Sequence, residues 1–189
     1  MDIDIAKIID RAKNIILTPK KEWPIIEAEK TEHIKILKSW LLPLSLIPAT
    51  AAFIGYGIFL RSLGLGLAYA LLQLLVILGG AYLTAFIINI LAEKFASEKN
   101  LNQAFALIAY SYTPACLGGI FYIIPSLSFI GSLIGLYSLY LIYIGIVPMM
   151  KTPAEKNTTY FIAILLCTIG VFFILSAVLG AIFIGGMMC

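Results

Sequence analysis

The clearest pattern in this chain is a series of long apolar stretches without any Asp, Glu, Lys or Arg. They cover residues 39–60, 62–92, 100–150 and 157–189, with lengths of 22, 31, 51 and 33 residues. About 20 apolar residues are enough for one helix to cross a hydrocarbon core roughly 30 Å thick. The pattern therefore predicts a protein that crosses the membrane several times.

The lengths of these stretches predict five transmembrane helices. The first, second and fourth stretches each fit one crossing, whereas one helix of 51 residues would be far longer than a bilayer is thick. That stretch has to fold back, and we expect the turn near Pro125, because proline disrupts a helix interior. Alternation with a period of two, typical of a membrane β-barrel, is absent from the sequence. We expect an all-α bundle with spans at about 39–60, 66–91, 104–124, 127–147 and 159–180.

The basic residues predict how these spans are oriented. With five spans, twelve of the thirteen Lys and Arg residues fall on the side that carries the N-terminus, and Arg61 falls on the other. Because basic residues accumulate in cytoplasmic segments, the N-terminus is predicted to be cytoplasmic and Cys189 to lie outside. We expect a multi-pass protein of a prokaryotic cytoplasmic (inner) membrane, the plasma membrane. No cleavable signal sequence is expected, since charges interrupt the first 15 residues.

A short amphipathic helix is predicted within the cytoplasmic segment 1–38, ahead of the membrane domain 39–189. Apolar residues recur at helical spacing, while Asp4, Lys7 and Arg11 occupy other faces. Such a helix suits a membrane surface, and packing of its apolar stripe against the bundle fits equally well. The stripe consists of Ile5, Ile8, Ile9, Ala12, Ile15 and Ile16.

Composition agrees with a membrane protein and excludes several other classes. The chain is 61% hydrophobic and 12% charged, with a mean hydropathy of +1.02. These values lie far from those of soluble domains, so soluble enzymes, disulfide scaffolds and disordered proteins are excluded. The net charge of +3 comes without a basic patch, and no nucleic-acid partner is predicted.

Candidates for chemistry are few, and neither an enzyme nor a cofactor is predicted. His33 is the one histidine, and a lone histidine with Glu29 nearby is more typical of a solvated helix face than of a metal site. The three cysteines show no metal-binding spacing. No ionisable Asp, Glu, Lys, Arg or His is expected at mid-depth in the membrane, which argues against active transport.

Some uncharged polar residues are nevertheless predicted to lie inside the membrane. We interpret them mainly as hydrogen-bonding groups between helices, and the alternative is a permeation path. The candidates are Gln73, Thr84, Asn89, Ser111, Thr113, Tyr137, Tyr140 and Tyr143.

Small residues four positions apart are predicted to mediate helix packing. They let two helix backbones approach closely in lipid, where no hydrophobic force drives helices together. The principal candidates are Gly131 with Gly135 in the fourth span and Ser176 with Gly180 in the fifth. A capping box of Thr152, Pro153 and Glu155 is predicted to start the last helix.

Three segments give the chain a resemblance to a known family. The segment 135–156, "GLYSLYLIYIGIVPMMKTPAEK", resembles the signature of the Ypt-interacting-protein (YIP) membrane family. The Pro-bearing third span "ALIAYSYTPACLGGIFYIIP" and the cytoplasmic "IILTPKKEWPII" are similar to its prokaryotic branch. The resemblance implies five spans and a cytoplasmic N-terminus, and it supplies no catalytic residues. Eukaryotic members associate with Rab-type GTPases, but this chain lacks their long cytoplasmic leader, which counts against GTPase binding.

Two functional hypotheses follow. The first is a non-enzymatic membrane protein that organises the membrane or partner proteins through helix–helix contacts, with the lipid bilayer, other membrane proteins or a second copy as its partners. The alternative is a small passive channel or exporter, formed by an oligomer around Gln73, Asn89 and the tyrosines of the fourth span.

Overall fold

The computed structural model describes residues 5–59 and 61–187, and this part of the chain is all-helical. The α-helices are α1 (Ile5–Leu17), α2 (Pro19–Glu29), α3 (His33–Ile36), α4 (Leu42–Phe59), α5 (Leu63–Leu91), α6 (Leu101–Ser111), α7 (Thr113–Gly118), α8 (Ser128–Gly135), α9 (Tyr137–Met150) and α10 (Ala154–Met187). A π-helical turn, Leu37–Leu41, joins α3 to α4. Three 3₁₀ segments follow in the chain: η2 (Ala92–Phe95), η3 (Gly119–Ile123) and η4 (Pro125–Leu127).

Four continuous helical segments in the described residues are long and apolar enough to cross a membrane. They are His33–Phe59, Leu63–Phe95, Leu101–Ile123 and Pro125–Met150, and each overlaps one predicted span. The fifth predicted span, 159–180, falls inside α10, whose side chains are described only as far as Phe173. An all-helical fold with four candidate membrane-spanning helices is therefore established, and the fifth crossing stays a prediction.

Prolines break the third span and separate it from the fourth, as their geometry requires. Pro114 follows a break at Tyr112, where α6 ends and α7 begins. The Thr113 hydroxyl donates to the Tyr110 carbonyl oxygen (2.7 Å), which satisfies one acceptor at this break. Ile124 is extended and η4 starts at Pro125, so the turn lies where the sequence predicts it.

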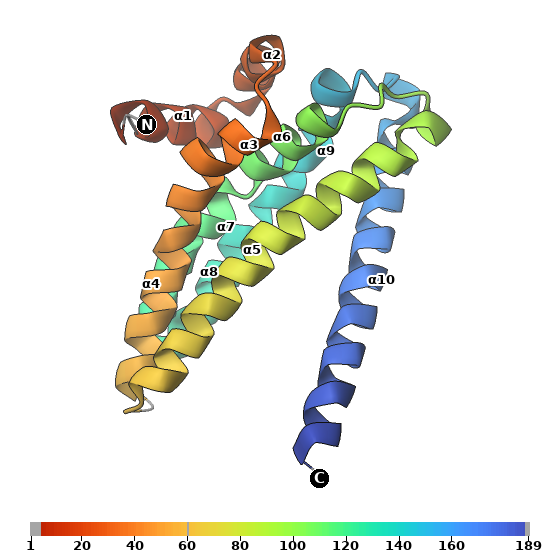
Figure 1. Cartoon of the computed structure of the whole chain (residues 1–189). Helices are drawn as coiled ribbons and strands as arrows, with labels where there is room; N and C mark the ends of the chain where they lie inside the picture. Colours follow the sequence, from red (N-terminus) through yellow and green to blue (C-terminus); the bar gives the residue numbers. More distant parts are fainter. Residues whose placement is uncertain (1–4, 60, 188–189) are drawn as a thin grey trace.

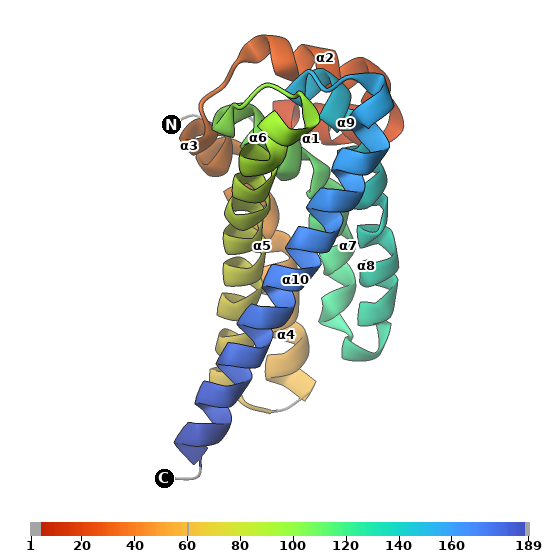
Figure 2. The same ribbon diagram turned by 90° about the vertical axis from the view of Figure 1, so that its right-hand side faces the viewer.

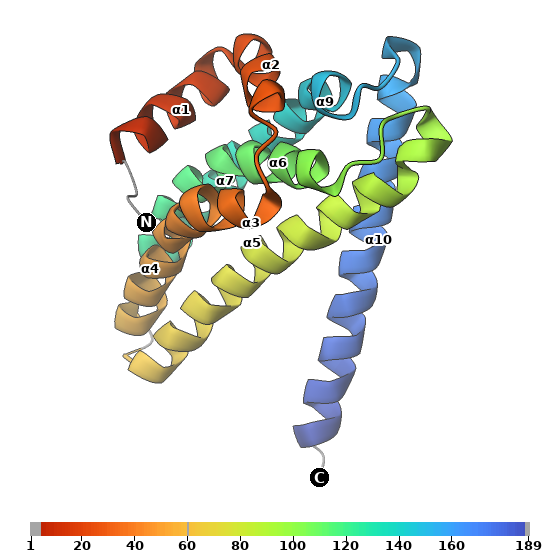
Figure 3. The same cartoon turned by 45° about the horizontal axis from the view of Figure 1, so that its top comes forward.

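The helices form a bundle with a layer of short helices across one end (Figure 1). Figure 3 shows α1 and α2 lying over α6 and α9 at this end. The bend between α4 and α5 lies at the opposite end, and α5 runs obliquely across the bundle (Figure 1). Figure 2 shows α10 crossing in front of the space between α5 and α8.

The third span forms the centre of the core. Ala104, Phe105, Leu107, Ile108 and Ala109 in α6 are each fully buried. Helices α5, α9 and α3 pack around α6, so that it is surrounded by protein while other spans present one side to lipid.

The amphipathic helix α1 is docked on the bundle rather than standing apart from it. Ile15 is fully buried and Ala12 nearly so, and α1 contacts α2, α6 and α7. Ile9 and Leu17 remain exposed on the same short helix. The apolar stripe thus divides between the core and the surface of the layer.

Glycines bring several backbones into close contact. A Cβ built on Gly131 in α8 would lie 2.6 Å from the carbonyl oxygen of Gly118 in α7, and one on Gly66 would lie 2.8 Å from the Cα of Gly57. A Cβ on Gly145 in α9 would lie 2.7 Å from the Trp23 ring, so this glycine makes room for α2. In contrast, a Cβ on Gly135 would meet only Ala115, at an ordinary 3.6 Å.

We predict that Gly131→Ala destabilises the protein. The new methyl group would meet the Gly118 backbone, which cannot rotate away as a side chain can, and overpacking of this kind costs about 1–3 kcal/mol. The measurement is the thermal melting of the purified protein in detergent. The matched control is Gly79→Ala in α5, where nothing lies within 4 Å of the new Cβ and the helix gains about 0.5–1 kcal/mol. Equal melting temperatures for the two variants would contradict the prediction.

Candidate functional site

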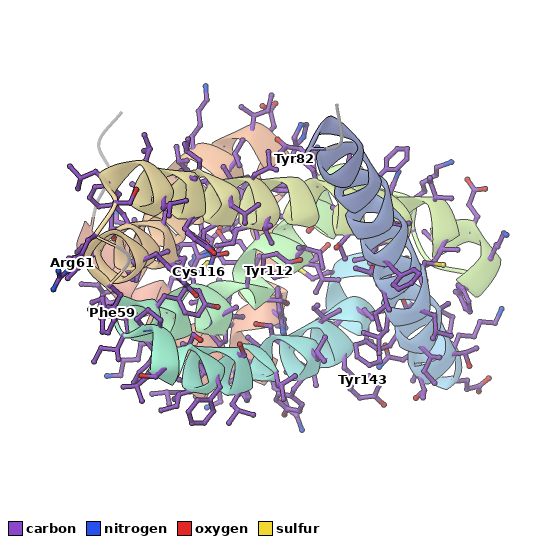
Figure 4. The ribbon with its side chains drawn as sticks, turned by 90° about the horizontal axis from the view of Figure 1, so that it is seen from below. Phe59, Arg61, Tyr82, Tyr112, Cys116 and Tyr143 are labelled. Atoms are coloured by element: carbon purple, nitrogen blue, oxygen red, sulfur yellow. The ribbon has the colours of Figure 1, made fainter. Side chains whose placement is uncertain are left out.

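A cavity of about 320 Å³ lies within the membrane-spanning part of the bundle. Figure 4 shows the labelled Tyr112 and Cys116 in the space between α5 and the run of α8 and α9. Helix α10 closes one side of the cavity with Phe161, Ile164 and Leu165. The remaining lining residues are Pro48, Gln73, Val76, Ile77, Thr84, Tyr112, Ala115, Cys116, Tyr122, Gly135, Ser138, Leu139, Ile142 and Thr168.

The structure distributes the predicted intramembrane polar residues over different places. Gln73 lines the cavity, whereas Asn89 lies outside its lining and its Oδ1 has no hydrogen-bond partner. The Thr113 side chain is fully buried, and its hydroxyl donates a hydrogen bond to the Tyr110 carbonyl oxygen, three residues earlier in the chain.

Two of the three tyrosines predicted for the fourth span, Tyr137 and Tyr140, are not among the residues that line the cavity. The Tyr137 hydroxyl donates to the Ile16 carbonyl oxygen at the end of α1 (2.9 Å), so it holds the N-terminal helix. The Tyr140 ring stacks at a tilt on Tyr137, with centroids 5.4 Å apart, and is 43% exposed. Tyr137 therefore joins the bundle to its layer of short helices.

Two hydroxyl-bearing residues that line the cavity, Ser138 and Thr168, were not among the candidates predicted from the sequence. Ser138 is buried and Thr168 is half-buried, and neither hydroxyl has a hydrogen-bond partner. Both residues line the cavity together with Thr84. The available signal was the helical spacing of Gly135, Ser138 and Ile142, which places them on one face.

The predicted packing residues lie in separate parts of the fold. Gly131 is in the tight contact between α7 and α8, and Gly135 borders the cavity. Ser176 and Gly180 lie in the part of α10 whose side chains are outside the described residues.

A cluster of charged and polar side chains around Arg11 connects the layer of short helices to the core. The Arg11 guanidinium of α1 pairs with the Glu29 carboxylate through both terminal nitrogens, and its Nε lies 3.5 Å from Glu22 Oε1. Glu22 is 5% exposed, so its charge is buried beside this cation. Arg11 also donates to the Tyr110 hydroxyl (3.4 Å), and its charged group lies over that ring. The hydrogen bond that Arg11 donates to Glu29 raises the pKa of the guanidinium above its ordinary value, so Arg11 stays charged.

Polar contacts also join the loops at this end of the bundle. The Ser97 and Thr152 hydroxyls hydrogen-bond to each other (2.8 Å), and α10 begins at Ala154, one residue after the start predicted from the capping box. Lys151 pairs with Glu98 (2.7 Å), which lowers the pKa of the glutamate and raises that of the lysine. Both groups are exposed, and such pairs contribute little to stability.

His33 has partners that its sequence context does not predict. Its Nδ1 lies 2.7 Å from Asn102 Oδ1, and its ring meets Tyr82 and Phe105 edge-on. The histidine is thus a contact between α3, α5 and α6, where a solvated face was expected. Among the residues that the structure describes, no three His, Cys, Asp or Glu side chains are grouped to hold a metal ion.

Comparison with known families identifies the family to which the chain belongs. The Yip1 domain model matches residues 13–183, which is almost the whole chain. The chain belongs to the Yip1 family. Together with its apolar helices, this membership identifies a multi-pass membrane protein, and the Yip1 family is not known as enzymatic. No curated protein and no solved structure matches the chain.

We predict that Arg11→Met loosens α1. The substitution keeps most of the side-chain volume but leaves the buried Glu22 without its cation, and hydrogen bonds to charged groups contribute about 1.5–3 kcal/mol. Faster amide hydrogen exchange is expected in 5–29, with 101–111 unchanged. Lys20→Met, an exposed position, is the control. Unaltered exchange in α1 would show that the cluster does not hold the layer in place.

Proposed function

We propose that this protein is a non-enzymatic, five-span membrane protein that organises other membrane proteins, or copies of itself, through helix–helix contacts within the bilayer. We place it in the cytoplasmic (plasma) membrane of a prokaryote, with its N-terminus in the cytoplasm and its C-terminus outside. Cys189, which this orientation puts outside, lies beyond the described residues.

The distribution of charge supports this orientation. The layer of α1 and α2 and the loops at 96–100 and 151–153 lie at one end of the bundle, and Arg61 lies at the other (Figures 1 and 4). Twelve of the thirteen basic residues then share one end, as the positive-inside rule expects with α10 as a fifth crossing.

The observation that carries the organising role is the loose attachment of α10. This helix contacts mainly α5 and α9. Beyond those contacts it turns large apolar side chains outward, with Leu166, Ile169 and Phe173 each more than half exposed. A Cβ on Gly170 would meet nothing within 4 Å, so this small residue has no neighbouring helix in the described structure. A small residue among apolar ones offers the close approach by which helices associate in lipid.

The residues of the alternative channel do not support that function equally well. Gln73 lines the cavity, whereas Asn89 is not among the lining residues. The Tyr137 hydroxyl is hydrogen-bonded to the Ile16 carbonyl oxygen of α1. They line no common path in one copy of the chain, and we therefore propose the organising role alone.

The orientation is tested by labelling introduced cysteines in a variant whose native cysteines are replaced by serine. Arg61 and Lys156 are exposed at opposite ends of the bundle. We expect Arg61→Cys to react with a membrane-impermeant maleimide on intact cells, and Lys156→Cys to react only after the cells are permeabilised. The reverse pattern would overturn the orientation.

The organising role is tested by placing a photo-crosslinking amino acid at Leu166 and illuminating native membranes. Because Leu166 lies on the outward face of α10, we expect adducts that contain a second polypeptide. Phe129 in α8 is 60% exposed on a different helix and serves as the matched control, with few protein adducts expected.

Expression of two differently tagged copies then separates self-association from a different partner, since only self-association yields an adduct with both tags. If Leu166 gives no protein adducts, or no more than Phe129 does, the organising role is wrong.

A further inference from the structure

A groove of about 570 Å³ separates the surface helix α1 from the first span. Figure 1 shows α1 lying across the end of the bundle where α4 begins. Helix α1 contacts α2, α6 and α7, and it faces α4 across this groove. The lining residues are Ile8, Ile9, Ala12, Lys13 and Ile16 of α1, Pro43, Leu44 and Ile47 of α4, and Leu117 of α7.

The lining of this groove is apolar apart from Lys13, which makes the groove a poor site for water. An ordered water needs two to four polar partners, and one ammonium group cannot supply them for a groove of this size. The volume lies within the roughly 300–1,000 Å³ that ligand sites occupy. The groove therefore suits a hydrocarbon chain better than a cluster of waters.

The groove lies at the level where the head groups of a bilayer give way to its acyl chains. Lys38 is the last charged residue before the charge-free part of the first span, and Pro43 and Ile47 follow it by five and nine residues. At 1.5 Å per residue they lie roughly 8 and 14 Å along the helix from Lys38, within one leaflet of a hydrocarbon core about 30 Å thick. The bilayer is therefore what borders the groove at this depth.

The exposed side chains of α1 also indicate contact with lipid. Ile9, Lys13 and Leu17 follow one another at intervals of four and form one row along the helix. Ile9 is 61% exposed and Leu17 is 67% exposed, and Ile9 and Lys13 both line the groove. A lysine between two exposed apolar residues is typical of a helix at the membrane interface, where the apolar groups enter the acyl region and the lysine reaches the head groups.

Lys13 brings an uncompensated positive charge to this groove. It is exposed, and it forms no salt bridge with an acidic residue in the part of the chain that the structure describes. Arg11, two residues earlier, differs because Glu22 and Glu29 pair with it. A phosphate group complements the free ammonium group of Lys13, and a lipid with a net negative charge has no ammonium of its own to compete for that phosphate.

We propose that this groove binds an anionic phospholipid, such as phosphatidylglycerol, from the leaflet next to α1. One acyl chain lies along Ile8, Ile47 and Leu117, and the phosphate pairs with Lys13. This inference goes beyond the organising role and does not depend on it, because lipid adducts in the groove and protein adducts at Leu166 are separate measurements.

The test uses the purified full-length protein in detergent and a phosphatidylglycerol with a photoreactive diazirine in one acyl chain. We expect saturable labelling that maps to residues of α1, α4 or α7 around the groove. Unlabelled dioleoylphosphatidylglycerol should compete about fivefold better than dioleoylphosphatidylcholine, which is the factor that one lysine contributes near anionic lipid. Labelling that does not saturate, that maps elsewhere, or that both lipids suppress equally would overturn the proposal.

A variant of the lysine tests the head-group contact. Lys13→Gln should weaken binding of the probe about fivefold and abolish the preference for phosphatidylglycerol over phosphatidylcholine. Its melting temperature should be unchanged, because the Lys13 side chain is exposed. The matched control is Lys20→Gln, which removes the same charge from an exposed lysine of α2 that does not line the groove, and it should keep the affinity of the parent. Equal losses in the two variants would show a general attraction of basic residues to anionic lipid, and the proposed site would be wrong.

Filling the groove tests the acyl-chain contact. Leu117 is 36% exposed and lines the groove, so Leu117→Trp should place an indole there and abolish saturable labelling. Ile9→Trp, at a groove position that is 61% exposed, should have the same effect and is the second variant should the first fail to fold. Ile120→Trp is the control, because Ile120 is 53% exposed and does not line the groove. If a folded Leu117→Trp or Ile9→Trp variant is labelled as well as Ile120→Trp, no acyl chain occupies the groove and the proposal fails.

Discussion

In hydrocarbon, two helices gain little from contact unless their backbones come close enough for many atoms to touch, because lipid tails are as apolar as leucine. This constraint explains where the bundle is tight. Gly131 meets the Gly118 backbone between α8 and α7, and Gly66 meets Gly57 between α5 and α4. These glycines bring α7 against α8 and α4 against α5. In contrast, α10 diverges from α5 (Figure 1), and a Cβ on its Gly170 would meet nothing within 4 Å.

The layer of short helices also depends on close packing at a glycine, and polar side chains attach it further to the bundle. Gly145 leaves the space that the buried Trp23 ring fills, so α2 can lie directly on α9. Arg11 then connects α1 to the two glutamates of α2 and to Tyr110 of the third span. Packing positions the layer, and the contacts of Arg11 with Glu22, Glu29 and Tyr110 fix its orientation. Arg11 is therefore the polar link between α1 and the most buried span.

Four spans and the turn at Pro125 followed from the sequence, because charge-free length and proline geometry are local properties. The faces of the helices did not. Spans such as α5 are apolar on every side, so periodicity gives no indication of which side packs against protein and which meets lipid. Ser138 was passed over for this reason. The pairing of Arg11 with Glu29 and Tyr110 joins residues 18 and 99 positions apart, and no local pattern reveals it.

The oblique course of α5 relates this protein to the thickness of its membrane. With 29 residues, α5 is about 43 Å long, which exceeds a hydrocarbon core of about 30 Å, and its inclination shortens the distance that it spans across the membrane. Hydrophobic mismatch acts on such an inclination, since a thicker bilayer favours a more upright helix. Because α5 carries one wall of the cavity and α10 another, an upright α5 would change the distance between these walls. Bilayer thickness is thus geometrically coupled to the width of the intramembrane cavity.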